Sequence, residues 1–311
     1  MKLQLSLYNV FLNAFFNKDV YLGKCTAMLS ASTLQLLRVK FSFFLMPVYW
    51  FALSQNNKIN ILHATIIFII LHFFLYPASN GYNSYMDRDA KSIGAVKAPM
   101  QPTKQLYYVS ILLDTAAVLG GLLISIYFTI CIVLFIAASR AYSYRGIRLK
   151  KYPVISWLTA ILFQGGLVYF MVWHGSSMPQ DLKVSWAPVA ASTLLTGCFF
   201  PLTQVFQHEQ DAADGVCTLS MRLGYRGTFV FSAGAYILSM IILGYYFTAG
   251  LELDRFLVLT GCMFPVMVYF IWWFGKVYKN ISAADYKNSL RMNIIMAVCM
   301  NTAFIILLML K

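Results

Sequence analysis

The sequence between Asn80 and Lys91 places side chains that could bind a metal ion directly after an apolar segment. An amide at Asn83 and a carboxylate at Asp87 are four residues apart, and a second carboxylate follows at Asp89. Side chains four residues apart share one face of a helix, so Asn83 and Asp87 could offer oxygens to one cation if the helix continues past the apolar segment. Mg²⁺ is the expected ion, because it takes one or two carboxylates and completes its shell with water and substrate phosphates.

A second polar cluster, Gln207-His-Glu-Gln-Asp-Ala-Ala-Asp214, follows another apolar segment further along the chain. Gln207 and Asp211 repeat the spacing of four residues, so they could supply further metal ligands. Of their neighbours, His208 could act on an acceptor hydroxyl, but we favour the interpretation that it orients Asp211 or is a bystander. The other nearby acids are Glu209 and Asp214.

A basic run with interleaved tyrosines, Arg140 to Lys151, lies between the two clusters. Basic residues at the end of an apolar segment are a common orientation signal. On the same face as both acidic clusters, they could also hold phosphate oxygens that the metal leaves exposed. The candidates for diphosphate binding are Arg148, Lys150, Lys97, Lys91, Tyr142 and Arg88.

The composition indicates which elements position these residues. The chain has 311 residues, of which 60% are hydrophobic and only 11% are charged, so it is too apolar for a soluble domain. Crossing the hydrocarbon core takes about 20 mostly apolar residues per helix. The sequence therefore predicts an all-α, polytopic protein of the lipid bilayer with nine spans. These are Leu34 to Ser54, Ile59 to Tyr76, Leu106 to Gly120, Leu122 to Ser139, Val154 to His174, Trp186 to Gln204, Phe229 to Ala249, Phe256 to Phe274 and Met292 to Leu310.

The distribution of basic residues predicts how the protein sits in the membrane. Lys and Arg collect in cytoplasmic loops. Twenty of the 24 basic residues fall in the N-terminal segment and in the loops after the even-numbered spans. The N-terminus and the polar clusters are therefore expected in the cytoplasm and the C-terminus on the opposite side. The four basic residues of that side are Lys58, Lys183, Arg255 and Lys311.

Three further features concern partners and domain boundaries. The net charge of +13 follows from this topology, and without a basic stripe or motif no nucleic-acid partner is expected. The six cysteines form no close pair and are interpreted as small buried hydrophobes. Residues 1–33 lack the design of a signal peptide and are expected to form a cytoplasmic extension ahead of a membrane domain at 34–311. The sequence carries no signal for an oligomeric state.

Three segments resemble motifs of the UbiA superfamily of intramembrane prenyltransferases. Asn83-Ser-Tyr-Met-Asp87-Arg-Asp89 looks like the first motif, Asn-x-x-x-Asp-x-x-x-Asp. Tyr142-Ser-Tyr-Arg-Gly-Ile-Arg-Leu-Lys150 is similar to the family's Tyr-Ser followed by Arg-Leu-Lys. Residues 207–219 resemble the second motif, in which Asp-x-x-x-Asp precedes Gly and Thr-Leu. With nine spans in matching order, the resemblance covers nearly the whole chain beyond residue 33.

The resemblance implies a nine-helix bundle around a central cavity, with Mg²⁺ and an isoprenyl diphosphate bound between the motifs. The implied reaction transfers the prenyl group to an apolar acceptor, such as an aromatic or quinone-like compound. Metal and basic groups would stabilise the departing diphosphate, and a dry aromatic cavity would shelter the allylic cation. The implied catalytic residues are Asp87, Asp211 and Asn83, and the implied metal ligands are Asn83, Asp87, Gln207 and Asp211.

The motifs depart from the family pattern at two positions. Lys91 stands where the third ligand of the first motif is expected, and Gln207 stands where the second motif usually opens with Asp. One or two Mg²⁺ ions therefore remain possible. In a site with one Mg²⁺ ion, Asn83, Asp87 and Asp211 would hold that ion, and the charge of Lys91 would replace the second ion. The nearby acids that could substitute as ligands are Asp89, Glu209 and Asp214.

Two alternative functions are also considered, and one charged residue is expected within the membrane. The altered motifs could mark a divergent enzyme of the same fold that uses another activated lipid in pigment or envelope-lipid synthesis. A non-catalytic lipid-binding protein or transporter is less favoured, because the polar residues gather on one face. Asp114 falls inside the third span, where its charge must be paired, neutralised or turned toward the cavity, and we expect a structural role.

Overall fold

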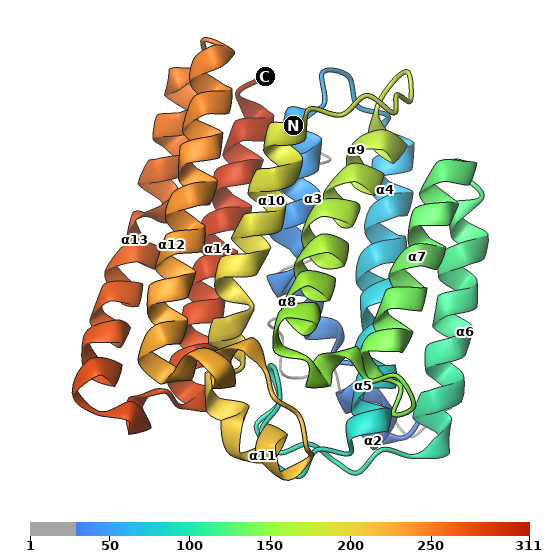
Figure 1. The fold of residues 1–311 in the computed structure, drawn as a ribbon. Helices are drawn as coiled ribbons and strands as arrows, with labels where there is room; N and C mark the ends of the chain where they lie inside the picture. Colours follow the sequence, from blue (N-terminus) through green and yellow to red (C-terminus); the bar gives the residue numbers. More distant parts are fainter. Residues whose placement is uncertain (1–28) are drawn as a thin grey trace.

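The computed structural model describes residues 29–311, which form an upright bundle of helices (Figure 1). Most of the predicted extension over residues 1–33 therefore lies outside the described residues. In the described range there is no β-strand, so the predicted all-α class is confirmed. The helices are α2 (Ala31–Leu36), α3 (Met46–Gln55), α4 (Ile61–Ile69), α5 (Tyr76–Asp87), α6 (Lys104–Gly121), α7 (Ile126–Ser143), α8 (Pro153–Ile161), α9 (Val168–Ser176), α10 (Trp186–Phe199), α11 (His208–Ala213), α12 (Leu219–Ala249), α13 (Leu253–Lys279) and α14 (Tyr286–Met309).

The membrane-spanning segments agree with the predicted spans. Eight segments within residues 29–311 are long and apolar enough to cross a membrane. Two of these join shorter helices through a π-helical turn, α4 to α5 and α8 to α9. The remaining predicted span, Leu106 to Gly120, corresponds to α6, an 18-residue helix beside α7 whose apolar character is reduced by Lys104 and Asp114. The predicted break at Gly120-Gly121 is confirmed, because α6 ends at Gly121.

The first span has the predicted extent but is not one regular helix. After α2, Arg38 adopts the left-handed conformation with φ of 47°, which interrupts a right-handed helix. A 3₁₀ segment, Val39–Phe44, follows, and α3 then begins with Pro47 in its first turn. Arg38 therefore sits at a break in the span.

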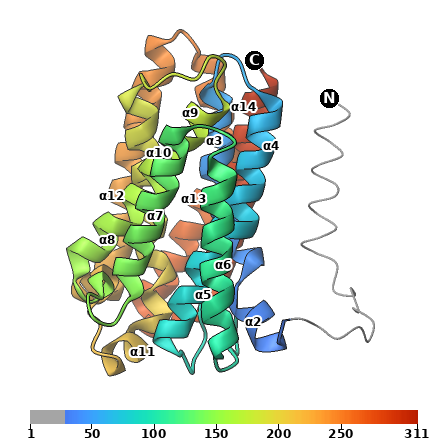
Figure 2. The same ribbon diagram turned by 90° about the vertical axis from the view of Figure 1, so that its right-hand side faces the viewer.

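The two polar clusters lie at the same end of the bundle. α5 continues past its apolar part to Asp87, as the spacing of Asn83 and Asp87 required. The short helix α11 crosses beneath the bundle at that end, and the C-terminus lies at the opposite end (Figure 2). The helical scaffold therefore brings together residues that are more than a hundred positions apart in the sequence.

Candidate active site

The first cluster forms a buried hydrogen-bonded group at the end of α5. Asn83 donates from Nδ2 to Asp87 Oδ2 at 2.9 Å and to Ser143 Oγ at 3.1 Å. Lys150 Nζ lies 2.5 Å from the other carboxylate oxygen of Asp87, Oδ1. The side chains of Lys150 and Asp87 are only 9% and 6% exposed. Asn83, Asp87 and Lys150, each predicted as a site residue, thus meet in one place.

The second cluster faces this group from α11. Asp211 lies within electrostatic range of Lys150, Asp87 and Asp89. Its backbone carbonyl accepts a hydrogen bond of 2.8 Å from the Val216 amide, which closes the turn after α11. Gly215 lies in this turn at φ of 67°, a conformation that favours glycine. The backbone conformation of this turn therefore explains why the second motif contains a glycine.

The basic run is fastened to the second cluster through Asp214. Arg148 forms an ion pair with the Asp214 carboxylate, and its Nη1 donates to the Asp214 carbonyl at 3.0 Å. Arg145 Nη1 lies 3.6 Å from Asp214 Oδ1, and Arg145 Nε donates to the Met86 carbonyl at 2.8 Å. Asp214 thus ties the loop after α7 to α11. Arg148, a predicted diphosphate-binding residue, lies at this junction.

Asp89 lies in the loop after α5 and is held by the second cluster. Its carboxylate accepts a hydrogen bond from the Gln210 amide. Burial raises the pKa of Asp89 to about 6, and the neighbouring charge of Asp87 adds to the increase, while Lys150 and Arg38 oppose it. Asp89 therefore joins the two motifs next to the site.

Three of the predicted diphosphate-binding residues lie on the surface of the loop after α5. Lys91 Nζ is 3.0 Å from Glu209 Oε2, and these side chains are 68% and 84% exposed. Arg88 is exposed, with its guanidinium 5.9 Å from the centre of the Tyr85 ring. Lys97 is also exposed. Their contact with a diphosphate stays a prediction.

The exposed pair of Lys91 and Glu209 leads to a first test. We expect Lys91→Ala to change the rate of the implied prenyl transfer by no more than about twofold, because solvent-exposed ion pairs contribute little interaction energy. Lys150→Ala serves as the comparison and should cause a far larger loss, since Lys150 is buried against Asp87. Steady-state rates of both variants provide the measurement. An equal loss in Lys91→Ala would mean that Lys91 replaces a metal ion after all.

Gln207 and His208 have different surroundings. Gln207 lines the central cavity, and its Nε2 lies 3.5 Å from the Ser92 carbonyl. His208 Nε2 lies 2.7 Å from Ser220 Oγ, and its ring stacks on Tyr225 with centres 4.6 Å apart. His208 thereby joins α11 to the start of α12, and its role in orienting Asp211 stays a prediction.

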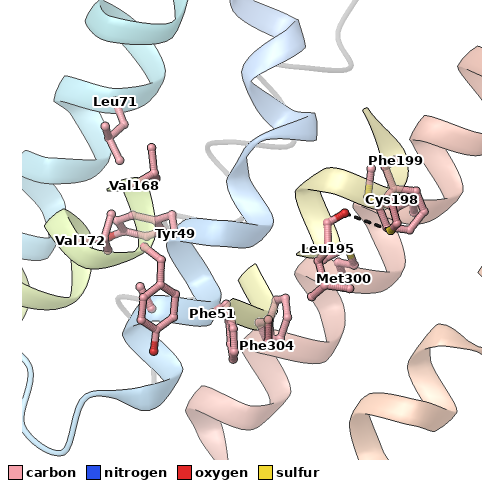
Figure 3. Close-up of a cluster of buried hydrophobic side chains, with 14 of the residues drawn as sticks. Tyr49, Phe51, Leu71, Val168, Val172, Leu195, Cys198, Phe199, Met300 and Phe304 are labelled. Atoms are coloured by element: carbon pink, nitrogen blue, oxygen red, sulfur yellow. Dashed lines mark hydrogen bonds between the residues drawn. The ribbon is translucent and has the colours of Figure 1, made fainter. Parts of the chain in front are cut away.

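A cavity of about 250 Å³ begins beside the first cluster and extends into the bundle. Six side-chain amides line it, at Asn80, Asn83, Gln164, Gln204, Gln207 and Asn293. Phenylalanine, leucine and methionine side chains form much of the remaining wall, with serine and threonine hydroxyls among them, and several of the apolar residues are drawn in Figure 3. The polar cluster is therefore continuous with a largely apolar interior.

The structure adds site residues that sequence reasoning missed. Arg38 lines the cavity, lies within electrostatic range of Asp87 and Asp89, and places Nη2 3.4 Å from the Asn80 carbonyl. Its Nε is buried without a hydrogen-bond partner. The available signal was an arginine inside an apolar span, which indicates a functional site unless the side chain reaches the membrane interface. Gln204 also lines the cavity with a buried, unpartnered Oε1.

Asp114 is paired outside the cavity. It forms an ion pair with Arg140, and their side chains are 12% and 21% exposed. The Arg140 guanidinium also lies 3.8 Å from the centre of the Tyr82 ring. This pairing agrees with the structural role expected for Asp114.

The donor set fits one Mg²⁺ ion that a substrate phosphate would complete. Within residues 29–311 no group of three or more His, Cys, Asp or Glu side chains is arranged to hold a metal by itself. Asp87 and Asp211 supply carboxylates, and Asn83 supplies an amide beside them. One oxygen of Asp87 is already paired with Lys150. Two carboxylates are what Mg²⁺ commonly takes from a protein, so these side chains are sufficient for one ion.

The fold and the site define a membrane-embedded helical protein whose apolar cavity opens among acidic and basic side chains. The chain belongs to the UbiA prenyltransferase family, whose sequence model matches residues 43–295. The predicted family and fold are thereby confirmed.

Solved structures share this fold at low sequence identity. A UbiA homologue from Archaeoglobus fulgidus bound to DMAPP and Mg²⁺ is 16% identical, with a TM-score of 0.68 over 90% of this chain and 100% of that chain. A digeranylgeranylglyceryl phosphate synthase is 20% identical, with a TM-score of 0.59 over 90% and 98%. An apo UbiA homologue from Aeropyrum pernix is 17% identical, with a TM-score of 0.64 over 86% and 98%. A search of curated proteins found no match.

Proposed function

We propose that this protein transfers a prenyl group from an isoprenyl diphosphate to an apolar acceptor, such as an aromatic or quinone-like compound. The observation that carries the proposal is the buried group of Asn83, Asp87 and Lys150, with Asp211 facing it, at the mouth of an apolar cavity. Such a group can bind a diphosphate and its metal, while the cavity accepts the hydrocarbon tail. The Archaeoglobus fulgidus homologue, bound to DMAPP or GPP with Mg²⁺, supports this assignment.

Each residue of the site has a defined task in this reaction. Asp87 and Asp211 would hold Mg²⁺ with Asn83 and Gln207, and the ion would neutralise charge on the leaving diphosphate. Lys150 is placed to bind diphosphate oxygens next to Asp87. Cleavage of the allylic C–O bond leaves the electron pair on the diphosphate. The acceptor then bonds to the allylic carbon and releases a proton.

The cavity protects the reactive carbon from water. Its aromatic walls include Phe135, Phe163 and Phe199. Aromatic faces attract a cation, and exclusion of water prevents its hydrolysis. We also propose that the polar end of the bundle faces the cytoplasm and the C-terminus the opposite side, as the distribution of basic residues predicts.

A transfer assay tests the proposal. Protein in lipid nanodiscs receives geranyl diphosphate, Mg²⁺ and a panel of phenols and hydroquinones, and prenylated products are identified by mass spectrometry. We expect product with Mg²⁺ and none after its removal with EDTA. Asp254→Asn is the control, because this exposed acid lies in the first turn of α13 at the other end of the bundle. Metal-independent activity, or no turnover of any prenyl diphosphate, would favour a divergent enzyme that uses another activated lipid.

A further inference from the structure

Several helices line the cavity, and on α14 one side chain from each successive turn faces it. On α14 the lining residues are Asn293, Met296, Met300 and Phe304, which follow one another at helical spacing. At about 1.5 Å per residue, the distance from Asn293 to Phe304 along the helix is about 16 Å. Because α14 begins at the end of the bundle that carries α11, Asn293 lies toward the mouth and Phe304 lies deepest. The cavity therefore runs along the bundle axis.

Two stacked phenylalanines close the deep end. Phe51 is the cavity-lining residue of α3 farthest from the mouth, and it faces Phe304 (Figure 3). Their ring centres are 4.5 Å apart with an interplanar angle of 23°, and both side chains are fully buried. Tyr169 packs behind Phe51 with ring centres 5.1 Å apart. The pair thus forms a rigid aromatic floor supported by a second layer.

The wall beside this floor contains polar groups. Gln164 lines the cavity from the π-helical turn between α8 and α9, and Ser192 lines it from α10. The turn packs tightly on α10, since a Cβ at Gly165 would lie 2.8 Å from the Thr193 Cα. Ser192 Oγ already donates to the Gly165 carbonyl at 3.3 Å, but a longer hydrocarbon tail would press against the Gln164 amide, which it cannot hydrogen-bond, and this is unfavourable. Both shape and polarity therefore oppose a longer tail.

The cavity volume limits the tail to a short prenyl chain. An apolar cavity of about 150 Å³ accommodates benzene, which has six carbons. By the same ratio, the 250 Å³ cavity of this protein has room for at most about ten carbons, because part of it belongs to the polar mouth.

We infer that Phe51 and Phe304 form the floor that sets the length of the prenyl tail and that the preferred donor is a ten-carbon, geranyl-length diphosphate. This inference rests on the proposed function. It adds the substrate class and the side chains that select it.

The experiment compares geranyl, farnesyl and geranylgeranyl diphosphates with Mg²⁺ in two assays. The first is the rise in the thermal unfolding midpoint on binding, and the second is product formation. Wild-type protein should favour the ten-carbon donor over the twenty-carbon donor by about tenfold. Phe304→Ala and Phe51→Ala should shift this ratio toward the twenty-carbon donor by a similar factor. Phe304→Leu gives a smaller shift and guards against loss of folding. Phe264→Ala on α13 is the matched control, because its side chain is 64% exposed and lies away from the cavity.

The two assays separate failure of the inference from failure of the proposed function. Equal binding of ten- and twenty-carbon donors by wild-type protein would overturn the inference, as would floor variants with an unchanged ratio. Length-selective binding that the floor variants relax supports the inference even if no acceptor is prenylated, a result that would contradict the proposed function alone. If no prenyl diphosphate binds at any length, both are wrong.

Discussion

Asp87→Ala is expected to slow prenyl transfer strongly and also to destabilise the protein. The activity loss follows from removal of the carboxylate that would hold the metal, and several kcal/mol of transition-state stabilisation correspond to about 10²- to 10³-fold in rate. The loss of stability has a separate cause. Asp87 is the ion-pair partner of buried Lys150. A buried charge left without its partner costs about 3–5 kcal/mol.

A double variant separates the two effects. Lys150→Met removes the stranded charge, so Asp87→Ala combined with Lys150→Met should recover much of the lost thermal midpoint and none of the activity. Asp87→Asn is a second comparison, since it keeps the shape of the side chain and removes its charge. The measurements are the unfolding midpoint in detergent and the transfer rate at saturating Mg²⁺. Recovery of activity in the double variant would show that Asp87 acts only by neutralising Lys150.

The helical scaffold of the site was predictable because it depends on patterns within short stretches of sequence. Apolar length predicted the spans, and the spacing of Asn83 and Asp87 predicted that α5 extends beyond its apolar part. The order of the clusters along alternating spans predicted that they meet at one end. The irregular backbone of the first span was not predictable, because no glycine or proline marks the left-handed residue Arg38.

The pairing of charges within the site could not be read from the sequence. Lys91 occupies the motif position where a third ligand was expected, yet its side chain lies on the surface beside Glu209. Lys150 comes from a loop about sixty residues later and is the cation that contacts Asp87. The left-handed turn at Arg88 ends α5 before Lys91, so the helical spacing that would align Lys91 with Asp87 is broken. A motif predicts geometry only while the backbone stays regular.

This pairing also gives the altered first motif a physical interpretation. A two-ion site needs enough anionic ligands to hold both ions, whereas one oxygen of Asp87 is already paired with Lys150, which also lies within electrostatic range of Asp211. A fixed lysine charge can neutralise part of a diphosphate that a second ion would otherwise bind. We therefore propose that one Mg²⁺ and Lys150 share this task.

The second large effect is expected at Asp114, outside the site. Asp114→Ala removes the partner of Arg140 within the membrane-spanning region, where an unpaired charge is unfavourable. Loss of one member of a buried pair should lower the free energy of unfolding by about 3–5 kcal/mol, seen as a clear drop in the thermal midpoint.

The same pair distinguishes a structural charge from a catalytic one. Asp114→Ala combined with Arg140→Leu should restore much of the stability, because replacing both charges by apolar groups leaves none stranded. Neither side chain lines the cavity, so the folded fraction of Asp114→Ala should bind geranyl diphosphate with an affinity within about twofold of wild type. Thermal unfolding and ligand titration of the same preparations provide both values. If Asp114→Ala kept its midpoint but lost affinity, the pair would act on the site through Tyr82 and α5, on which Arg140 packs.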